Sequence, residues 1–308
     1  MSVKNIIDLK KNLKKDCSSL KVVKVALLGD SATQLLAQAL RGYGYDAGLN
    51  LELFEAGYDQ IERQVFDMSS DLYHFHPEWA VLFNSTHTLI KNFYTLGSHE
   101  RSTFAEHQIA LIQSLYESIS SQQPCKVIYY NFAEINDGVF GNYCNKVDTS
   151  FTFQLRKLNY QLMELSQRLQ HLFICDISAL HNRYGESFVC DSKLYITAGM
   201  VFSIDFLPHV AKNTVDIIHS ASGKFTKCLI LDLDNVLWGG IIGDDGLENI
   251  QLGALGIGKA FTELQLWAKQ LKQAKSFMII QARQKLCTAG LLMAHQRLNG
   301  RKSKAVVS

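Results

Sequence analysis

The chain has 308 residues, of which 47% are hydrophobic and 19% charged, and its 31 Lys and Arg nearly balance its 29 Asp and Glu. This composition excludes a disordered chain, and the length exceeds that of most single domains. No apolar run approaches the roughly 18 residues of a membrane span, and the N-terminus lacks the apolar segment of a secretory signal. The seven cysteines are an odd number without paired spacing, which fits a reducing compartment. We therefore expect a cytoplasmic protein of two domains.

The near-neutral total conceals an uneven distribution of charge. The 45 residues after Glu263 include nine basic and no acidic residues, whereas the first 263 have 22 basic and 29 acidic residues, a net charge of −7. A basic tail can bind nucleic acid or an anionic membrane. Aromatic residues, which form the stacking platforms of single-strand binding surfaces, are not interleaved with these basic residues. We therefore expect neither nucleic acid nor a membrane as a partner.

Apolar runs of strand length alternate with longer amphipathic segments from residue 21 onward. We predict strands at 22–28, 49–54, 80–83, 126–130 and 172–175. We predict helices at 34–41, 104–121, 151–169 and 207–219. Five apolar strands that are separated by helices favour a parallel sheet covered on both faces, because strands buried in this way are apolar on both sides.

The pattern restarts after the loop at 220–224. A new apolar run at 228–233 is followed by a glycine-rich stretch and by an amphipathic helix at 259–273. The sequence therefore predicts four segments: an N-terminal helix at 1–20, an α/β domain at 21–222, the start of a second α/β domain at 223–273 and a basic tail at 274–308.

Two carboxylates, Asp232 and Asp234, lie at the carboxyl end of the predicted strand at 228–233. Ligands of open α/β sheets gather at this edge. Two acids there can hold a hard divalent cation, and one of them can attack an electrophile. The alternative is that both side chains cap the turn that follows, which is a common use of Asp.

The residues around this pair make the signal more specific. Asp-Leu-Asp-Asn-Val-Leu-Trp at 232–238, followed by Gly-Gly-Ile-Ile-Gly-Asp-Asp-Gly-Leu at 239–247, resembles the first motif of the haloacid dehalogenase (HAD) superfamily in its FkbH-like branch. The preceding region, 21–220, resembles the N-terminal domain that accompanies FkbH-like phosphatase domains. The resemblance implies Mg²⁺-dependent hydrolysis or transfer of a phosphoryl group on a small phosphorylated molecule. Some members are associated with loading a glyceryl unit onto an acyl-carrier protein, which would then be a partner.

The resemblance also implies a role for each carboxylate. Asp232 would attack phosphorus and form an aspartyl-phosphate, and Asp234 would protonate the leaving oxygen and later activate water. Asp232 and the backbone carbonyl of Asp234 would hold Mg²⁺. One departure is Val236, where the family commonly has Thr, so that a hydroxyl is lost while the branched shape is kept.

The tail departs from the family pattern. A HAD site also needs a Ser or Thr for the phosphate, a Lys and a later acidic pair, but residues 274–308 include no acidic residue and no recognisable form of the other motifs. The last acidic residue, Glu263, and the end of the resemblance, near residue 272, lie within about ten residues of each other. We therefore expect a shift of reading frame near residues 272–275 and a truncated, inactive HAD domain. A genuine basic tail is the alternative.

A second constellation lies in the first predicted domain, where a strand ends in Gly-Asp-Ser at 29–31. This ending is similar to the first block of the SGNH hydrolases, and Gly57 and Asn84 fall where that family keeps its oxyanion donors. An active site of this kind would use Ser31 as an acyl nucleophile. It also needs an Asp-x-x-His, and the candidates fit poorly. Asp205 and His209 are four residues apart, whereas Asp216 and His219 have the right spacing but lie in the last predicted helix beside the linker.

We therefore favour Ser31 as the N-cap of the helix that follows, which is the commonest use of Ser after a strand. The predicted fold class is α/β, with a flavodoxin-like, SGNH-type parallel sheet domain followed by an incomplete HAD-like Rossmannoid domain. The predicted function is that of a Mg²⁺-dependent HAD phosphatase. Two rivals stay open, an acyl esterase that uses Ser31 and a non-enzymatic remnant that binds a partner.

Overall fold

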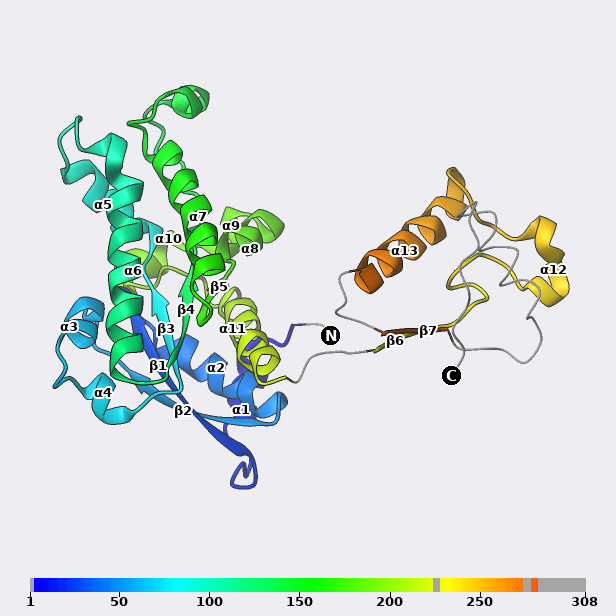
Figure 1. Cartoon of the computed structure of the whole chain (residues 1–308), viewed down its shortest axis with the longest axis horizontal. Helices are drawn as coiled ribbons and strands as arrows, with labels where there is room; N and C mark the ends of the chain where they lie inside the picture. Colours follow the sequence, from blue (N-terminus) through cyan, green and yellow to red (C-terminus); the bar gives the residue numbers. More distant parts are fainter. Residues whose placement is uncertain (1–2, 224–227, 274–277, 282–308) are drawn as a thin grey trace. The chain divides into compact units, whose positions relative to one another are not determined.

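The computed structural model describes residues 3–223, 228–273 and 278–281. The chain divides into two compact units, Met1–Gly223 and Lys224–Ser308 (Figure 1). Apart from 278–281, the predicted basic tail at 274–308 lies outside the described residues, so the expected change of reading frame stays a prediction.

The first unit is built on a five-stranded sheet. Its strands are β1 (Lys21–Gly29), β2 (Leu49–Glu55), β3 (Trp79–Phe83), β4 (Lys126–Tyr130) and β5 (Leu172–Cys175). They lie in the order β2-β1-β3-β4-β5, and every neighbouring pair is parallel. This is the flavodoxin-like strand order. The predicted parallel sheet is confirmed, and each strand ends within one residue of its predicted position.

Helices cover both faces of this sheet (Figure 1). One face packs against α1 (Ile6–Asn12), α2 (Gln34–Asp46), α8 (Ile177–Tyr184), α9 (Glu186–Val189) and α11 (Leu207–Ala221). The other face packs against α3 (Ile61–Phe66), α4 (Asp71–Phe75), α5 (Thr86–Thr95), α6 (Phe104–Gln122) and α7 (Phe151–Arg168). The unit also includes α10 (Ser192–Ala198) and the short 3-10 helices η1 (Arg101–Thr103) and η2 (Gly141–Lys146).

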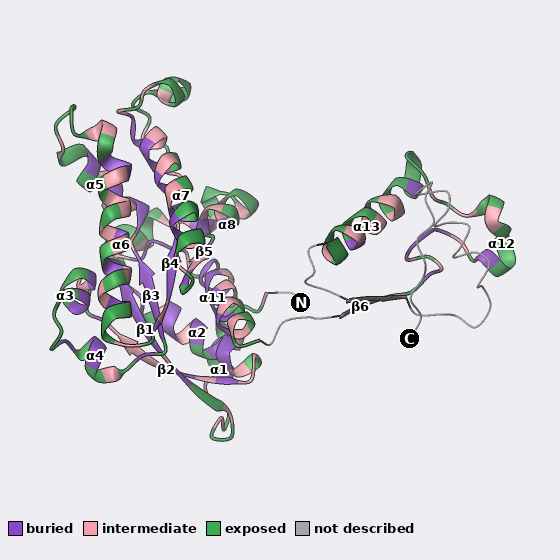
Figure 2. Cartoon of the chain, in the orientation of Figure 1, coloured by how far each residue is buried: buried purple, intermediate pink, exposed green. Residues whose placement is uncertain are grey.

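The inner strand β1 is apolar on both of its sides. Its Val25 and Leu27 belong to one core cluster, whereas Ala26 and Leu28 belong to the other. Successive side chains of a strand point to opposite faces, so a strand that is covered twice must be apolar at every position. Buried residues accordingly run along the inner strands (Figure 2). Burial of one such Val or Leu side chain contributes about 1.5–3 kcal/mol.

Polar residues that follow the strands begin several of the helices. Ser85, two residues after the end of β3, accepts a hydrogen bond from the Thr88 N–H at the start of α5. Asp176, directly after β5, accepts one from the Ala179 N–H at the start of α8. Each such N-cap contributes about 1 kcal/mol to the stability of its helix. The same caps place polar groups at the carboxyl edge of the sheet.

The second unit is described in four elements: β6 (Cys228–Leu231), α12 (Ile242–Asn249), α13 (Gly256–Gln273) and β7 (Met278–Gln281). The two strands pair in parallel, so the chain crosses from one to the other through the two helices. Its buried cluster consists of Leu233, Leu237, Trp238 and Ile242. This is a strand–helix–strand unit, and no complete HAD domain is visible within the described residues.

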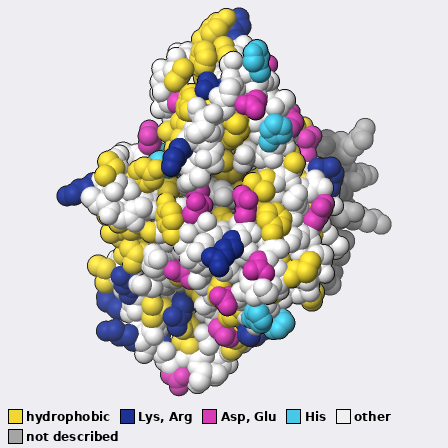
Figure 3. All heavy atoms as spheres, turned by 90° about the vertical axis from the view of Figure 1, so that its left-hand side faces the viewer, with side chains coloured by type: hydrophobic (Ala, Val, Ile, Leu, Met, Phe, Trp, Pro, Cys, Tyr) yellow, Lys and Arg dark blue, Asp and Glu magenta, His cyan; other side chains and the backbone are white. Residues whose placement is uncertain are grey.

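The surface over α3, α4 and α5 is shown in Figure 3. Acidic, basic and histidine side chains are interspersed there with apolar ones, so this face has charges of both signs side by side. Within the described ranges, no helix is long and apolar enough to cross a lipid bilayer.

The packing of α1 on α2 generates a first prediction. A Cβ on Gly42 would lie 2.7 Å from the Leu9 carbonyl oxygen and 2.8 Å from the Leu9 Cβ. Since backbone atoms cannot move aside cheaply, we expect Gly42→Ala to lower the free energy of unfolding by about 1–3 kcal/mol. Urea unfolding measures this change. The matched control is Gly97→Ala, whose Cβ would approach only the flexible Glu100 carboxylate, at 3.4 Å. Equal stability of the two variants would contradict the close approach of the helices.

Candidate functional site

The carboxyl ends of β1 and β3 lie side by side in the middle of the sheet. After β1 the chain leads to β2 on one side, and after β3 it leads to β4 on the other side. The chain therefore turns in opposite directions after β1 and after β3. Such a switch point is where open α/β sheets bind their ligands. Asp30 and Ser31 follow β1, and Asn84 and Ser85 follow β3. The fold therefore brings two predicted site residues, Ser31 and Asn84, to the same edge.

Asp30 is the polar centre of this switch point and is only 2% exposed. Its Oδ2 accepts hydrogen bonds from the Ser85 N–H at 2.8 Å and from the Ser85 hydroxyl at 3.2 Å. Its Oδ1 has no hydrogen-bond partner among the described residues. Burial raises the pKa of Asp30, and the charge of Asp59 adds to this effect, whereas the bonds from Ser85 oppose it. The buried oxygen without a partner costs folding free energy, which makes Asp30 a locally destabilising group.

The prediction that Ser31 caps a helix is wrong. The helix α2 begins after Thr33, and no side chain caps it. The Ser31 hydroxyl is buried and has no hydrogen-bond partner in the described part of the chain. The reason is geometric, since two residues separate Ser31 from the first turn of the helix, and its side chain points into the protein instead.

The predicted oxyanion donors have different surroundings. The Asn84 Oδ1 accepts a hydrogen bond from the buried Tyr129 hydroxyl at 2.8 Å, so the Asn84 amide group has a fixed orientation. Gly57 lies in the exposed loop after β2. That loop is tied to β1 by the Asp59 N–H, which donates to the Gly29 carbonyl at 3.3 Å. Both residues therefore follow strands that flank β1, although no bond joins either of them to Ser31.

The candidate bases for Ser31 lie elsewhere. The His209 ring, on α11, packs among aromatic rings. Its centroid lies 4.3 Å from that of Tyr184 and 5.5 Å from that of Phe188. Burial lowers the pKa of His209, and Asp205 is exposed ahead of the helix. Since the Ser31 hydroxyl has no partner within the described residues, no histidine there is positioned to take its proton. Within the described residues, Ser31 therefore has no general base.

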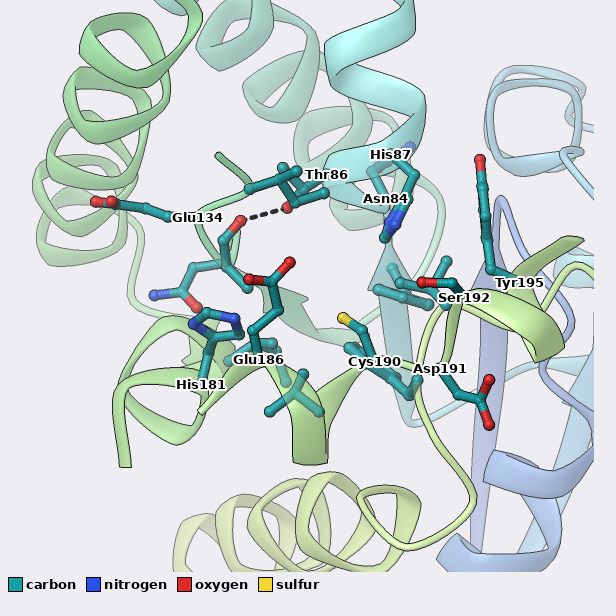
Figure 4. Close-up of a pocket in the computed structure, with 18 residues that line it drawn as sticks. Asn84, Thr86, His87, Glu134, His181, Glu186, Cys190, Asp191, Ser192 and Tyr195 are labelled. Atoms are coloured by element: carbon teal, nitrogen blue, oxygen red, sulfur yellow. Dashed lines mark hydrogen bonds between the residues drawn. The ribbon is translucent and has the colours of Figure 1, made fainter. Parts of the chain in front are cut away.

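A cavity of about 90 Å³ opens at the carboxyl edge of the sheet, beside the switch point (Figure 4). Its walls come from the residues that follow β3, β4 and β5 and from α8, α9 and α10. Polar residues that line it include Asn84, His87, Asn131, Glu186, Cys190 and Tyr195. Only Asn84 among these was predicted, because the other residues come from separate segments that form no sequence motif.

Two side chains of this cavity have altered pKa values. Burial lowers the pKa of His87, and its Nδ1 is buried without a hydrogen-bond partner in the described chain. The His87 ring lies against the Tyr195 ring, with centroids 4.3 Å apart. Burial raises the pKa of the Cys190 thiol to about 11. At neutral pH the cavity therefore presents an uncharged imidazole and an uncharged thiol.

In the second unit, Asp232 follows β6 directly and its side chain is exposed. Its Oδ1 accepts a hydrogen bond from the neighbouring Leu233 N–H at 2.8 Å. The other carboxylate oxygen makes no hydrogen bond within the described residues, and it is free to meet an electrophile or a cation. The predicted strand at 228–233 is two residues shorter in the structure, which places Asp232 after the strand instead of within it.

Asp234 organises the loop that follows. Its Oδ1 accepts hydrogen bonds from the Trp238 indole N–H at 3.1 Å and from the Ile242 N–H at 3.4 Å. The chain turns sharply at Asn235, which follows Asp234 and has a φ of +56°. The Asn235 Oδ1 accepts a bond from the Gly240 N–H at 2.9 Å and closes the turn. Asp234 therefore caps the turn, as the structural alternative predicted, while its second oxygen stays available.

The donor chemistry of this loop fits Mg²⁺. Mg²⁺ prefers oxygen ligands, keeps several waters and is commonly held by only one or two carboxylates. Asp232 offers an exposed carboxylate oxygen, and the two acids follow a strand end. No three His, Cys, Asp or Glu side chains of the described residues come together as a metal site. Any Mg²⁺ here would therefore depend on water or a substrate oxygen for most of its ligands.

Residues 24–219 match the protein family described as FkbH, N-terminal domain, which is more than half of the chain. The chain belongs to the FkbH N-terminal domain family. The FkbH-like resemblance predicted for residues 21–220 is therefore confirmed. No curated protein matches the chain significantly.

Among solved structures, the N-terminal part of the protein BF1531 from Bacteroides fragilis is 45% identical to this FkbH family member. The match covers 92% of this chain and 74% of that chain, with a TM-score of 0.85. That structure contains a phosphatase domain and was determined in complex with Mg. Because Met1–Gly223 makes up less than three quarters of the 308 residues, a match over 92% includes part of the second unit.

More distant matches are esterase-like and lipase-like structures. An acetyl xylan esterase, AlAXEase, is 16% identical, with 64% of this chain and 100% of that chain covered and a TM-score of 0.40. A G-D-S-L family lipolytic protein from Desulfitobacterium hafniense DCB-2 is 10% identical, with 63% and 99% covered and a TM-score of 0.40.

Replacement of Asp30 should stabilise the protein. In Asp30→Asn the amide oxygen can still accept from Ser85, while the buried charge disappears, so we expect about 1 kcal/mol or more of added stability at neutral pH. A carboxyl whose pKa is raised on folding stabilises the fold only in its protonated form. The gain should therefore be smallest below the ordinary pKa of 3.8 and should grow as the pH rises through the folded-state pKa. Urea unfolding at a series of pH values tests this, and a gain that falls towards neutral pH would contradict it.

Replacement of Ser31 should not destabilise the protein. Because its buried hydroxyl makes no hydrogen bond in the described chain, Ser31→Ala removes an unpaired polar group and should leave the free energy of unfolding unchanged or raise it by about 1 kcal/mol. The matched control is Ser85→Ala, which removes a helix cap and a bond to Asp30 and should cost about 1–3 kcal/mol. Thermal unfolding compares the two variants. A loss in Ser31→Ala as large as that in Ser85→Ala would show a bond that this structure lacks.

Proposed function

We propose that the Asp232 and Asp234 loop of the second unit is the phosphoryl-transfer site of a Mg²⁺-dependent phosphatase. The observation that supports it most directly is the 45% identity to a protein with a phosphatase domain crystallised with Mg, over a match that extends into the second unit. The exposed Asp232 carboxylate at the end of β6 fits the role of nucleophile. The proposed substrate is a small phosphorylated metabolite.

In the proposed reaction, a carboxylate oxygen of Asp232 attacks phosphorus, and the bond from phosphorus to the leaving oxygen breaks. Asp234 gives its proton to that oxygen. Water then attacks the aspartyl-phosphate, with its proton passing back to Asp234, and inorganic phosphate leaves. The bonds from Trp238 and Ile242 hold one oxygen of Asp234 and leave the other for this proton transfer. Bound Mg²⁺ would supply positive charge that balances the phosphoryl oxygens.

The described second unit supplies the nucleophile and the acid–base group of this reaction. In the HAD resemblance, a Ser or Thr, a Lys and a later acidic pair complete the site, but residues 274–308 include no acidic residue and no recognisable form of the other motifs. We therefore propose that the chain by itself turns over phosphate esters slowly. The acyl esterase alternative loses support, because Ser31 is buried and its hydroxyl has no partner, and so no base, among the described residues.

A narrower proposal concerns the acceptor. The FkbH-like resemblance alone supports transfer of a glyceryl unit from a bisphosphoglycerate to an acyl-carrier protein. Incubation of the chain with 1,3-bisphosphoglycerate and a holo-carrier protein, followed by intact-mass measurement of the carrier, tests it. A glyceryl adduct would support the transfer reaction, and release of phosphate without an adduct would favour simple hydrolysis.

The phosphatase proposal predicts a graded loss of activity. Asp232→Asn should abolish phosphate release, because an amide cannot act as the nucleophile. Asp234→Asn should lower it by roughly 10²–10⁴, as expected for the loss of an acid–base group. Phosphate release from p-nitrophenyl phosphate, with Mg²⁺ and with EDTA, measures both. The matched control is Asp244→Asn, a nearby exposed carboxylate outside the proposed reaction. Full activity in the Asp232 variant, or activity that persists in EDTA, would refute the assignment.

A further inference from the structure

The cavity at the carboxyl edge of the first unit is lined by residues of that unit, and no part of the proposed phosphatase reaction uses it. It measures about 90 Å³, and one water needs roughly 10–15 Å³ of such space. It therefore has room for a molecule of about six non-hydrogen atoms. A concave site with apolar walls and a few convergent polar groups is the usual form of a small-molecule site.

The charge of the cavity is one-sided. Its lining includes three carboxylates, Glu134, Glu186 and Asp191, but no Lys or Arg. Glu134 is already paired with Arg156 through two bonds, at 2.6 and 2.7 Å. Asp191 caps α10 by accepting from the Lys193 and Leu194 N–H groups. Glu186 makes no ion pair or hydrogen bond through its side chain in the described chain, so one carboxylate remains for a ligand.

The positions of the side chains complement this charge. Figure 4 shows the Glu186 carboxylate and the Cys190 sulfur directed towards the middle of the cavity, with Asn84 and His87 across from them. The Asn84 oxygen is held by Tyr129, which leaves the Asn84 NH₂ group as a donor. Stacked rings of Phe83 and Phe202, with centroids 4.8 Å apart, form an apolar wall. Aromatic walls beside a carboxylate suit an organic cation.

We propose that this cavity binds a small organic amine that also has a hydrogen-bond acceptor such as a hydroxyl. The ammonium group pairs with Glu186, the acceptor meets the Asn84 NH₂ group, and the carbon atoms lie against Phe83 and Phe202. Anions are disfavoured, because the single free charge of the wall is negative and no Lys or Arg offsets it. The first unit is then a binding module for an amine and not a second site for phosphate esters.

The Cys190 thiol, which lines the cavity, reports on its occupancy. The chain is treated with methyl methanethiosulfonate at about pH 8, above the ordinary histidine pKa of about 6.5, so that Glu186 is the dominant charge. Peptide mass mapping follows the modification of Cys190, with Cys17, which lies outside the cavity, as the internal control. Three probes of similar size are compared: ethanolamine, ethylene glycol and glycolate. We expect ethanolamine to protect Cys190 at the lowest concentration and glycolate to give no protection, while Cys17 reacts equally in all samples.

The variant Glu186→Gln tests the ion pair. Since Glu186 is exposed and forms no bond that holds the fold, the variant should unfold at the same urea concentration as the parent chain. The ethanolamine concentration for half protection should rise about tenfold, as expected for the loss of a charge-assisted bond. The control Glu62→Gln removes an exposed carboxylate outside the cavity and should change nothing. Equal or better protection by glycolate or ethylene glycol, no protection by any probe, or an unchanged Glu186→Gln would overturn the proposal.

Discussion

Burial of β1 on both of its faces is the constraint on which the first unit depends. The strand lies between β2 and β3, so every one of its inner side chains must fill a core, Val25 and Leu27 on one side and Ala26 and Leu28 on the other. A parallel sheet of this kind aligns all of its carboxyl ends at one edge. The buried stretches of the inner strands are apolar, and the polar residues Asp30, Asn84 and Asp176 follow the strands at this edge. The location of the candidate site follows from the packing of the core.

The switch point combines stabilising and destabilising contacts. Ser85 caps α5 and also donates to Asp30, so one side chain joins the ends of β1 and β3. Asp30 nevertheless stays buried with an unpaired oxygen and a raised pKa, and the buried Ser31 hydroxyl beside it has no partner in the described chain. Neither arrangement improves stability, and unpaired buried polar groups of this kind are found at functional sites. Here the adjoining cavity and not Ser31 offers the accessible chemistry, since its free carboxylate and uncharged imidazole face open space.

The sequence predicted the sheet well because buried parallel strands are continuous apolar runs with distinct ends. It predicted α2 less well, as a helix at 34–41, because Gly42 and Gly44 resemble a helix end. In the folded chain the helix continues to Asp46, since Gly42 allows Leu9 of α1 to approach and Gly44 lies against Leu51. The Ser31 cap was wrong although the start of the helix at residue 34 was predicted correctly, because Ala32 and Thr33 separate Ser31 from the first turn of α2. The cavity could not be predicted, because Asn84, Glu186 and Cys190 come from separate segments that only the tertiary fold brings together.

The two candidate sites follow the same topological rule and differ in charge. Both lie where parallel strands end, but Asp232 and Asp234 need a cation from outside before a phosphate can approach, because two carboxylates repel an anion. The first-unit cavity has one free carboxylate and aromatic walls, and it attracts the opposite class of molecule directly. In that cavity Glu134 and Asp191 are already bonded, and Glu186 makes no side-chain bond within the described residues. The amine-binding and phosphoryl-transfer proposals consequently depend on separate groups. Removal of Mg²⁺ should abolish phosphate release and leave the protection of Cys190 by ethanolamine unchanged.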